Sequence, residues 1–345
     1  MKKWLQWVAA LVILTVLIWV FRDELDFLQD GFRRLRTADP FAVGLVIITS
    51  LGAIIAMAEV MRVLIRAGGV PVPLKETTAI TLASNAWSTT LPAGPAFSAI
   101  LTFHVQRGWG ASVALAGWFF VLSSAVSTMW LVLIGLGGVV FLNAQMQVLS
   151  LLLALLAVVA LCALVFWISN HPRTIERWLS RQKFLRGGKR DALIKQVRNL
   201  SEVHLNRWQF AQVAGYSLAN RLLDMASLWA CVWAITGDIP ALHAGEDQTT
   251  LAGVALAYLT AKLAGSAQVT PAGLGTVEAA IIATLVATGL TAIDATGAAV
   301  IYRLISFALI TVIGWVVYFW HYAQNGLTYA ALNRKEHDDA SRTAA

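Results

Sequence analysis

Five ionisable residues stand out in this 345-residue chain because apolar residues surround them. They are Arg221, Asp224, Lys262, Glu278 and Arg303. A charged side chain at the centre of a membrane helix costs about 2.5 to 3.5 kcal/mol on insertion scales, so each one needs a partner or a function. Guanidinium and ammonium groups bind phosphate, and a carboxylate can balance a cation or move a proton. The set therefore predicts either a network of ion pairs or a site for an anionic ligand.

The spacing of these residues favours some pairs over others. Arg221 and Asp224 lie one helical turn apart, which allows an ion pair within one helix. That pairing leaves Lys262 and Arg303 as cations suited to an anionic lipid phosphate. For Arg303 two partners compete: Glu278, which would make a structural ion pair, and a lipid phosphate, which would make a binding site. We expect the phosphate.

The composition indicates a membrane protein. Apolar residues make up 58% of the chain and charged residues 13%, whereas an average soluble domain has roughly 25% charged residues. A helix needs about 20 apolar residues to cross the hydrocarbon core. Six apolar runs predict such helices, at residues 4–21, 41–63, 111–141, 147–168, 209–236 and 294–320. The first run is longer than a signal-peptide core and predicts a retained anchor.

Two further apolar stretches, at residues 77–103 and 251–290, are each interrupted by a Pro-Ala-Gly motif. Proline removes a helical hydrogen bond and glycine permits a tight turn, so each motif ends one helix and starts another. Each arm is about 15 residues, or roughly 22 Å at about 1.5 Å per residue, which is too short to cross the membrane. The residues that we assign to a substrate site at these turns and their approaches are Asn85, Ser88, Pro92, Gly94, Thr270, Pro271, Gly273 and Gly275.

These interruptions predict two re-entrant helical hairpins, at residues 77–107 and 251–290. Aligning Pro92 with Pro271 also aligns Gly94 with Gly273. Three expected crossings separate the hairpins, so they must open to opposite sides of the membrane. The alternative is that proline and glycine only kink ordinary spans.

The expected fold is an all-α integral membrane protein, with six full transmembrane helices and two oppositely oriented re-entrant hairpins that form an inverted repeat. Such repeats place a substrate site near the midplane. We divide the chain into an anchor helix and an interfacial helix (1–40), a first repeat (41–141), a linking helix with a basic cytoplasmic loop (142–207), a second repeat (208–321) and a cytoplasmic tail (322–345).

The charged residues orient the expected helices. Residues 170–207 carry ten Lys or Arg against three acids, whereas residues 237–250 carry three acids and no Lys or Arg. The positive-inside rule places the first segment, and with it both termini, in the cytoplasm of a cell with an inner (plasma) membrane. The formal net charge of +7 then reflects topology, and we expect no nucleic-acid partner. The two cysteines have no metal-binding spacing, and we expect no metal or cofactor.

The second motif carries a family resemblance. Thr270-Pro-Ala-Gly-Leu-Gly-Thr-Val-Glu278, followed by Ile301-Tyr-Arg303, resembles the lysylphosphatidylglycerol synthase/flippase transmembrane-domain family, and the resemblance covers roughly residues 41–320. It implies two re-entrant hairpins and translocation of a phospholipid, with Glu278 and Arg303 at functional positions. It also implies that residues 91–94 form the first hairpin turn.

The chain departs from this family in two respects. Many members carry an acidic residue soon after the first turn, whereas residues 95–98 are uncharged here. Larger members add an aminoacyl-transferase domain, which we do not expect because only 25 residues follow Trp320.

The expected function is that of a lipid flippase or scramblase, and not an enzyme, that moves a phospholipid or a polyprenyl-phosphate-linked lipid between leaflets. One alternative is a membrane enzyme that acts on a lipid phosphate, with Glu278 as acid/base and Arg303 as phosphate clamp. The other is a non-catalytic subunit of a lipid-modifying or glycosyltransferase complex. The expected partners are membrane lipids with an anionic or lipid-linked headgroup; an enzyme partner and a second copy of the chain are left open.

Overall fold

The computed structural model describes residues 35–91, 93–141, 156, 160, 205–266 and 273–323. Every regular element in these ranges is helical, which confirms the all-α prediction for the described part of the chain. The expected span at 4–21, nearly all of the span at 147–168, and the turn residues Pro92, Thr270 and Pro271 lie outside the described residues.

Three helical stretches are long and apolar enough to cross a membrane. They are α3 (Pro40–Ala67), most of α6 (Val113–Phe141), and the run Ala292–Tyr322, which consists of α13 (Ala292–Tyr302), η3 (Arg303–Leu309), α14 (Ile310–Val317) and η4 (Tyr318–Tyr322). A fourth long helix, α10 (Arg207–Thr236), has 30 residues, and the charged residues Arg221 and Asp224 interrupt its apolar sequence. The predicted multi-pass membrane protein is confirmed, and the count of six spans stays a prediction.

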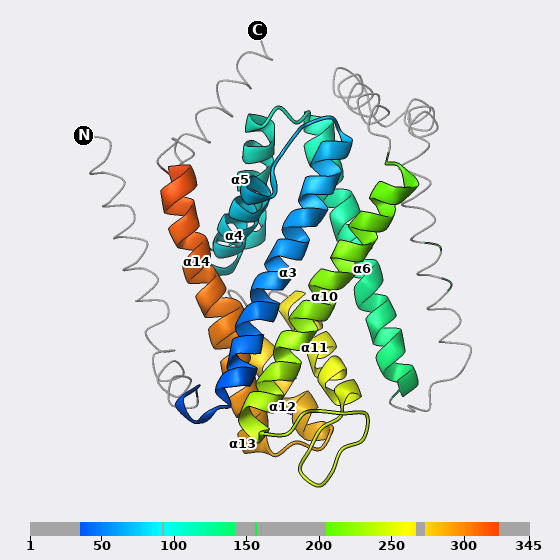
Figure 1. Ribbon diagram of the computed structural model, residues 1–345, viewed down its shortest axis with the longest axis vertical. Helices are drawn as coiled ribbons and strands as arrows, with labels where there is room; N and C mark the ends of the chain where they lie inside the picture. The colour runs from blue at the N-terminus through cyan, green and yellow to red at the C-terminus, as the bar shows by residue number, and fades with distance from the viewer. Residues whose placement is uncertain are drawn as a thin grey trace, which may run out of the picture.

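Helices α3 and α10 lie side by side and form the spine of the described body (Figure 1). Small hydroxyl side chains let them approach closely: the Ser227 Oγ lies 2.8 Å from the Thr49 Oγ1 and 3.1 Å from the Ser50 Oγ. Farther along, the Asn220 side-chain amide donates to the carbonyl of Ala53 at 2.8 Å. These polar contacts fix the register of α10, and therefore the height of Asp224, against α3.

Four shorter helices form two antiparallel pairs, α4 (Leu74–Thr90) with α5 (Gly94–Gly108), and α11 (Leu251–Ser266) with α12 (Thr276–Ala287). At 12 to 17 residues each, they measure about 18 to 26 Å, which is less than the roughly 30 Å of a hydrocarbon core. Figure 1 places α4 and α5 in the upper half of the body and α11 and α12 in the lower half. The two pairs therefore start from opposite ends and turn back inside the body.

The first turn is tight. Ala93 adopts a left-handed backbone with φ of 53°, which is uncommon for a residue other than glycine. A Cβ on Gly94 would lie 2.1 Å from the carbonyl oxygen of Ser88, so only glycine fits against the end of α4.

The second turn uses two left-handed glycines, Gly273 with φ of 67° and Gly275 with φ of 77°. After each pair, the chain also turns into the next long helix through a left-handed glycine, Gly110 before α6 and Gly289 before α13. The turns themselves are not identical, because the left-handed residue aligned near Gly273 in the first pair is Ala93, one position earlier.

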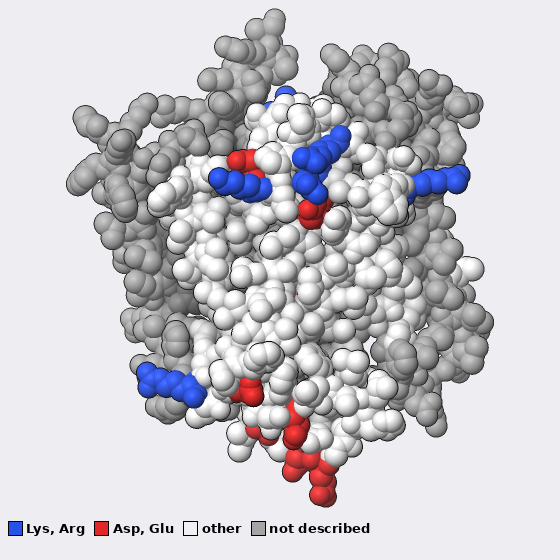
Figure 2. All heavy atoms as spheres, viewed as in Figure 1, with Lys and Arg blue, Asp and Glu red and all other residues white. Residues whose placement is uncertain are grey.

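Basic residues predominate toward the upper end of the body, where acidic groups lie among them, and acidic residues predominate toward the lower end (Figure 2). Arg66, Lys75, Arg107 and Arg207 lie at the ends of helices that meet at the upper end. The lower end carries the loop 237–250 with its three acids. This segregation matches the charge asymmetry from which the orientation was predicted.

Candidate functional site

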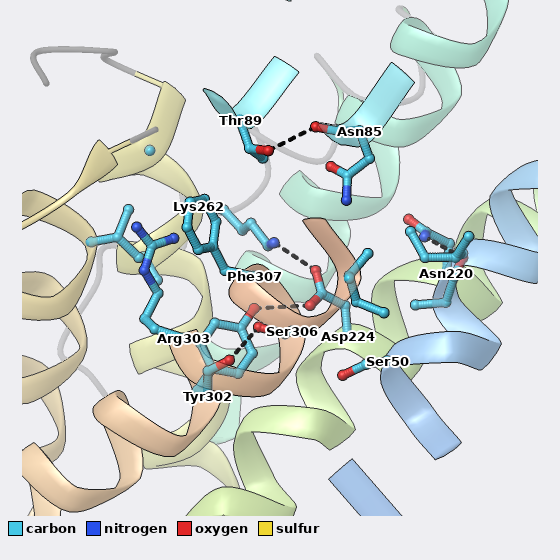
Figure 3. Close-up of a pocket in the computed structure, with 16 residues that line it drawn as sticks. Ser50, Asn85, Thr89, Asn220, Asp224, Lys262, Tyr302, Arg303, Ser306 and Phe307 are labelled. Carbon is cyan, nitrogen blue, oxygen red and sulfur yellow. Dashed lines mark hydrogen bonds and ion pairs between the residues drawn. The ribbon is translucent and has the colours of Figure 1, made fainter. Parts of the chain in front are cut away.

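A cavity of about 320 Å³ lies at the depth where the two short helix pairs turn back (Figure 3). Helices α3, α4, α10, α11, α12 and the last long run all contribute to its wall. The lining residues are Ser50, Ala53, Ile54, Asn85, Thr89, Asn220, Asp224, Ala261, Lys262, Gly265, Val277, Tyr302, Arg303, Ser306, Phe307 and Ile310. The cavity therefore joins polar residues that lie more than 200 positions apart in the sequence.

Asp224 is the most highly coordinated side chain of the cavity. Its Oδ2 lies 2.5 Å from the Nζ of Lys262 and accepts a hydrogen bond from the Tyr258 hydroxyl at 3.3 Å. Its Oδ1 accepts a hydrogen bond from the Tyr302 hydroxyl at 2.8 Å. The carboxylate from α10 is thus bound by a cation and a phenol from α11 and by a second phenol from α13.

Lys262 reaches Asp224 from the first arm of the second pair (Figure 3). Its ammonium also lies 5.2 Å from the centre of the Tyr258 ring, within the range of a cation–π interaction. The Lys262 side chain remains 30% exposed. An ammonium held this way is neutralised and still reachable from the cavity.

Arg303 and Glu278 form a second and more enclosed ion pair. The Arg303 Nε lies 2.5 Å from the Glu278 Oε1, and the two side chains are 8% and 12% exposed. The guanidinium carbon lies 4.2 Å from the centre of the Phe307 ring. The structure therefore brings Glu278, one of the two partners suggested for Arg303, into contact with it.

Glu278 also has an unusual second oxygen. Its Oε2 is buried and has no hydrogen-bond partner among the described residues. A buried polar atom of this kind is costly unless something binds it. Glu278 does not line the cavity, although Arg303 does.

Arg221 is not placed as the sequence suggested. Its Nη2 donates to the Ser127 Oγ of α6 at 2.5 Å, and the carboxylate of Asp224 is bound by Lys262 instead. Arg221 does not line the cavity. The spacing allowed a pair within α10, but Asp224 faces α11 and α13, where Lys262 and two tyrosines compete for it.

The last long run carries a π-helical segment at the cavity. The segment η3 begins at Arg303 and brings Arg303, Ser306 and Phe307 into the wall. Such wide turns inside α-helices are frequent at functional sites. Here the wide turn presents a cation and an aromatic ring to the same space.

The other residues assigned from the sequence divide into two groups. Asn85 lines the cavity, and its side chain points into it in Figure 3. Ser88, Gly94, Gly273 and Gly275 do not line it and shape the turns instead.

Sequence reasoning did not identify several lining residues, notably Tyr302, Thr89, Asn220 and Ser306. The signal that could have found them is a polar side chain at helical spacing from one already chosen. Thr89 follows Asn85 by four positions, and Ser306 follows Arg303 by three.

The fold and the cavity define a multi-pass helical membrane protein with a charged site inside its apolar body. Among the residues that the structure describes, no group of three or more His, Cys, Asp or Glu side chains could hold a metal ion. The sequence matches the family model of the lysylphosphatidylglycerol synthase transmembrane region over residues 7–314. The chain belongs to this family, which makes it a membrane protein of lipid metabolism. No curated protein matches the chain.

Proposed function

We propose that the protein is a lipid flippase or scramblase that moves the headgroup of a phospholipid or lipid-linked substrate through the cavity. The observation that carries this proposal is a cavity lined by Lys262, Arg303 and Asp224 between two short helix pairs from opposite ends of the body. A headgroup crossing hydrocarbon needs polar partners at mid-depth, because it leaves its water behind.

The two pairs are proposed to be re-entrant hairpins of an inverted repeat. Their helices are short for a membrane, and each pair is followed by a left-handed glycine that leads into a long helix. Non-helical backbone at mid-depth is tolerated where it is buried or lines a wet cavity, and inverted repeats place substrate sites there. The lipid class follows from the cations: Lys262 and Arg303 suit a phosphate or phosphodiester.

The upper end of Figure 1 is proposed to face the cytoplasm of a cell with a plasma membrane, as the positive-inside rule favours. Cysteines placed at exposed positions test this in a Cys162→Ala/Cys231→Ala background. An impermeant reagent added to intact cells should label Ala244→Cys, in the acidic loop, and should spare Lys75→Cys. The reverse pattern would overturn the orientation.

Translocation is tested by reconstitution into liposomes whose labelled lipids report their leaflet, with a phosphatidylglycerol probe and a polyprenyl-phosphate probe run separately. The matched variants are neighbours on α3. Ile54 lines the cavity, whereas Ile55 is 45% exposed on the outer face. We expect faster exchange than in protein-free vesicles for the unaltered chain and Ile55→Trp, and a loss for Ile54→Trp. Equal rates in all vesicles, protein-free ones included, would contradict the proposal.

A further inference from the structure

The Asp224–Lys262 pair is the more exposed of the two ion pairs at the cavity. Its side chains are 20% and 30% exposed, against 12% and 8% for Glu278 and Arg303. Both members of the pair line the cavity. An anionic headgroup that enters therefore meets an ammonium that already holds a carboxylate.

An anion that takes the ammonium of Lys262 leaves Asp224 without its ion-pair partner. The ionisable groups that face Asp224 are Lys262 and Tyr258 from α11, Tyr302 from α13 and, on its own helix, Arg221. Arg221 attracts Asp224 through space, but its guanidinium is hydrogen-bonded to Ser127 on α6.

The other charged lining residue, Arg303, is bound to Glu278. Asn85 and Ser50, which line the cavity from α4 and α3, carry no charge. Arg221 stays within electrostatic range of Asp224, but among these groups Lys262 is the one that forms an ion pair with it. A carboxylate that loses its ion pair in a low-dielectric interior is disfavoured, and binding a proton relieves it.

The two phenols make either state of Asp224 acceptable. A hydroxyl can donate or accept a hydrogen bond. When Asp224 is charged, both tyrosines donate to it, as the structure shows. When it is protonated, its O–H can donate to one phenol oxygen while the other phenol continues to donate. The carboxyl group therefore keeps its hydrogen bonds in both states.

We propose that this pair couples the movement of each anionic lipid headgroup to one proton, a proposal that rests on the translocation proposed above. A phosphodiester oxygen of the lipid replaces the Asp224 carboxylate at the Lys262 ammonium, which keeps its own proton. A proton from the aqueous phase forms an O–H bond with a carboxylate oxygen of Asp224. When the lipid leaves, Asp224 releases the proton and binds Lys262 again.

This exchange conserves the charge of the site. Before binding, Lys262 and Asp224 sum to zero; afterwards Lys262 and the lipid anion sum to zero beside a neutral acid. The lipid and the proton therefore cross as an electroneutral pair. A pH gradient drives this movement, and a membrane potential does not.

The first test measures proton uptake when the purified full chain binds dioctanoyl phosphatidylglycerol in weakly buffered detergent at neutral pH. We expect about one proton per bound lipid for the unaltered chain and none for Asp224→Asn. Glu246→Gln, the same type of change in the exposed acidic loop, should keep the uptake. Because Asp224→Asn leaves Lys262 without its carboxylate, Asp224→Asn/Lys262→Gln serves as the neutral variant if the single one does not fold. Lipid binding without proton uptake in the unaltered chain, or unchanged uptake in Asp224→Asn or in the double variant with lipid bound, overturns the coupling.

The second test uses proteoliposomes with labelled phosphatidylglycerol. We expect a pH gradient to accelerate translocation severalfold, a potassium diffusion potential with valinomycin to leave it unchanged, and Asp224→Asn to lose the response to pH. Translocation that ignores the pH gradient overturns the coupling and leaves the proposed function standing. Absence of translocation under every condition overturns the proposed function on which the coupling rests.

Discussion

The two short helix pairs differ in what holds them and in what they bring to the cavity. The first pair is fastened to the last long run: the Thr89 and Thr311 hydroxyls lie 3.1 Å apart, and the Trp315 Nε1 donates to the Thr90 hydroxyl at 3.2 Å. Gly314 completes this contact, because a Cβ there would lie 2.3 Å from the Leu82 carbonyl oxygen. The residues that this pair contributes to the cavity, Asn85 and Thr89, are neutral.

In the second pair, the two helices are held to each other, and they carry charged residues. The Thr260 and Thr284 hydroxyls lie 2.9 Å apart and join α11 to α12, and the Thr249 and Thr288 hydroxyls lie 2.9 Å apart just before α11 and just after α12. Its charges, on Lys262 and Glu278, are bound by acceptors and donors on other helices. The comparison indicates that the first pair belongs to the framework, whereas the second pair presents the exchangeable charges.

The largest effect is expected from the buried ion pair between Arg303 and Glu278. Arg303→Ala leaves Glu278 buried without its cation, which should cost about 3 to 5 kcal/mol and lower the amount of folded protein. Adding Glu278→Gln removes the unpaired carboxylate and should restore much of the yield of folded protein. Yield and thermal melting in detergent measure both variants. Normal yield of Arg303→Ala would show that the pair is not structural.

Arg303→Lys separates pairing from headgroup recognition. Lysine keeps the charge for Glu278 but loses the planar guanidinium that binds phosphate at two points. We expect normal yield with impaired translocation in the same liposome assay. Translocation at the unaltered rate would assign Arg303 to folding alone.

An intermediate effect is expected where α14 packs against α4 and so holds the first helix pair. Gly314→Ala forces α14 away from α4 and should destabilise the protein by about 1 to 3 kcal/mol, as overpacking does. Gly117→Ala is the control, since a Cβ at this position in α6 meets nothing within 4 Å. Melting temperatures compare the two. If both variants melt alike, the close contact with Leu82 does not fasten the first pair.

The smallest effects are expected from the hydroxyl contacts. Thr260→Val and Thr89→Val each remove one hydrogen bond between helices, worth about 0.6 kcal/mol in membranes. Amide exchange should rise in α11 and α12 for the first variant and in α4 and α14 for the second. If both variants raise amide exchange in the same helices, the two short helix pairs do not differ in what holds them.

Much of the fold could be predicted from the sequence because the signals are local. Apolar runs predicted α3, α6 and the last long run, and Pro-Ala-Gly motifs predicted where the short helices break. The π-helical turn at Arg303 has no such local signal, because it depends on how the last run packs against α3 and α4.

The sequence predicted which residues form the site better than it predicted which of them form ion pairs. The cost of charge in hydrocarbon singled out Lys262, Asp224 and Arg303, which the cavity brings together. The pairing of Asp224 with Lys262 was missed, because helical spacing suggests contacts within one helix and this contact joins α10 to α11. Tyr258 was missed because an aromatic residue in an apolar run carries no sign of the carboxylate it faces. Tyr302 was noted only as part of the Tyr-Arg sequence at 302–303 that carries the family resemblance.

On the proposed function, a lipid headgroup passes Lys262 in the cavity. This proposal is tested most directly by comparing Lys262→Gln with Lys75→Gln, the same change at an exposed lysine in the first turn of α4. Both proteins are reconstituted at equal folded amounts, and the translocation of labelled phosphatidylglycerol is measured. We expect Lys75→Gln to match the unaltered chain and Lys262→Gln to be slower by roughly tenfold, which corresponds to about 1.4 kcal/mol of lost interaction in the transition state. Equal rates for the two variants would contradict the account.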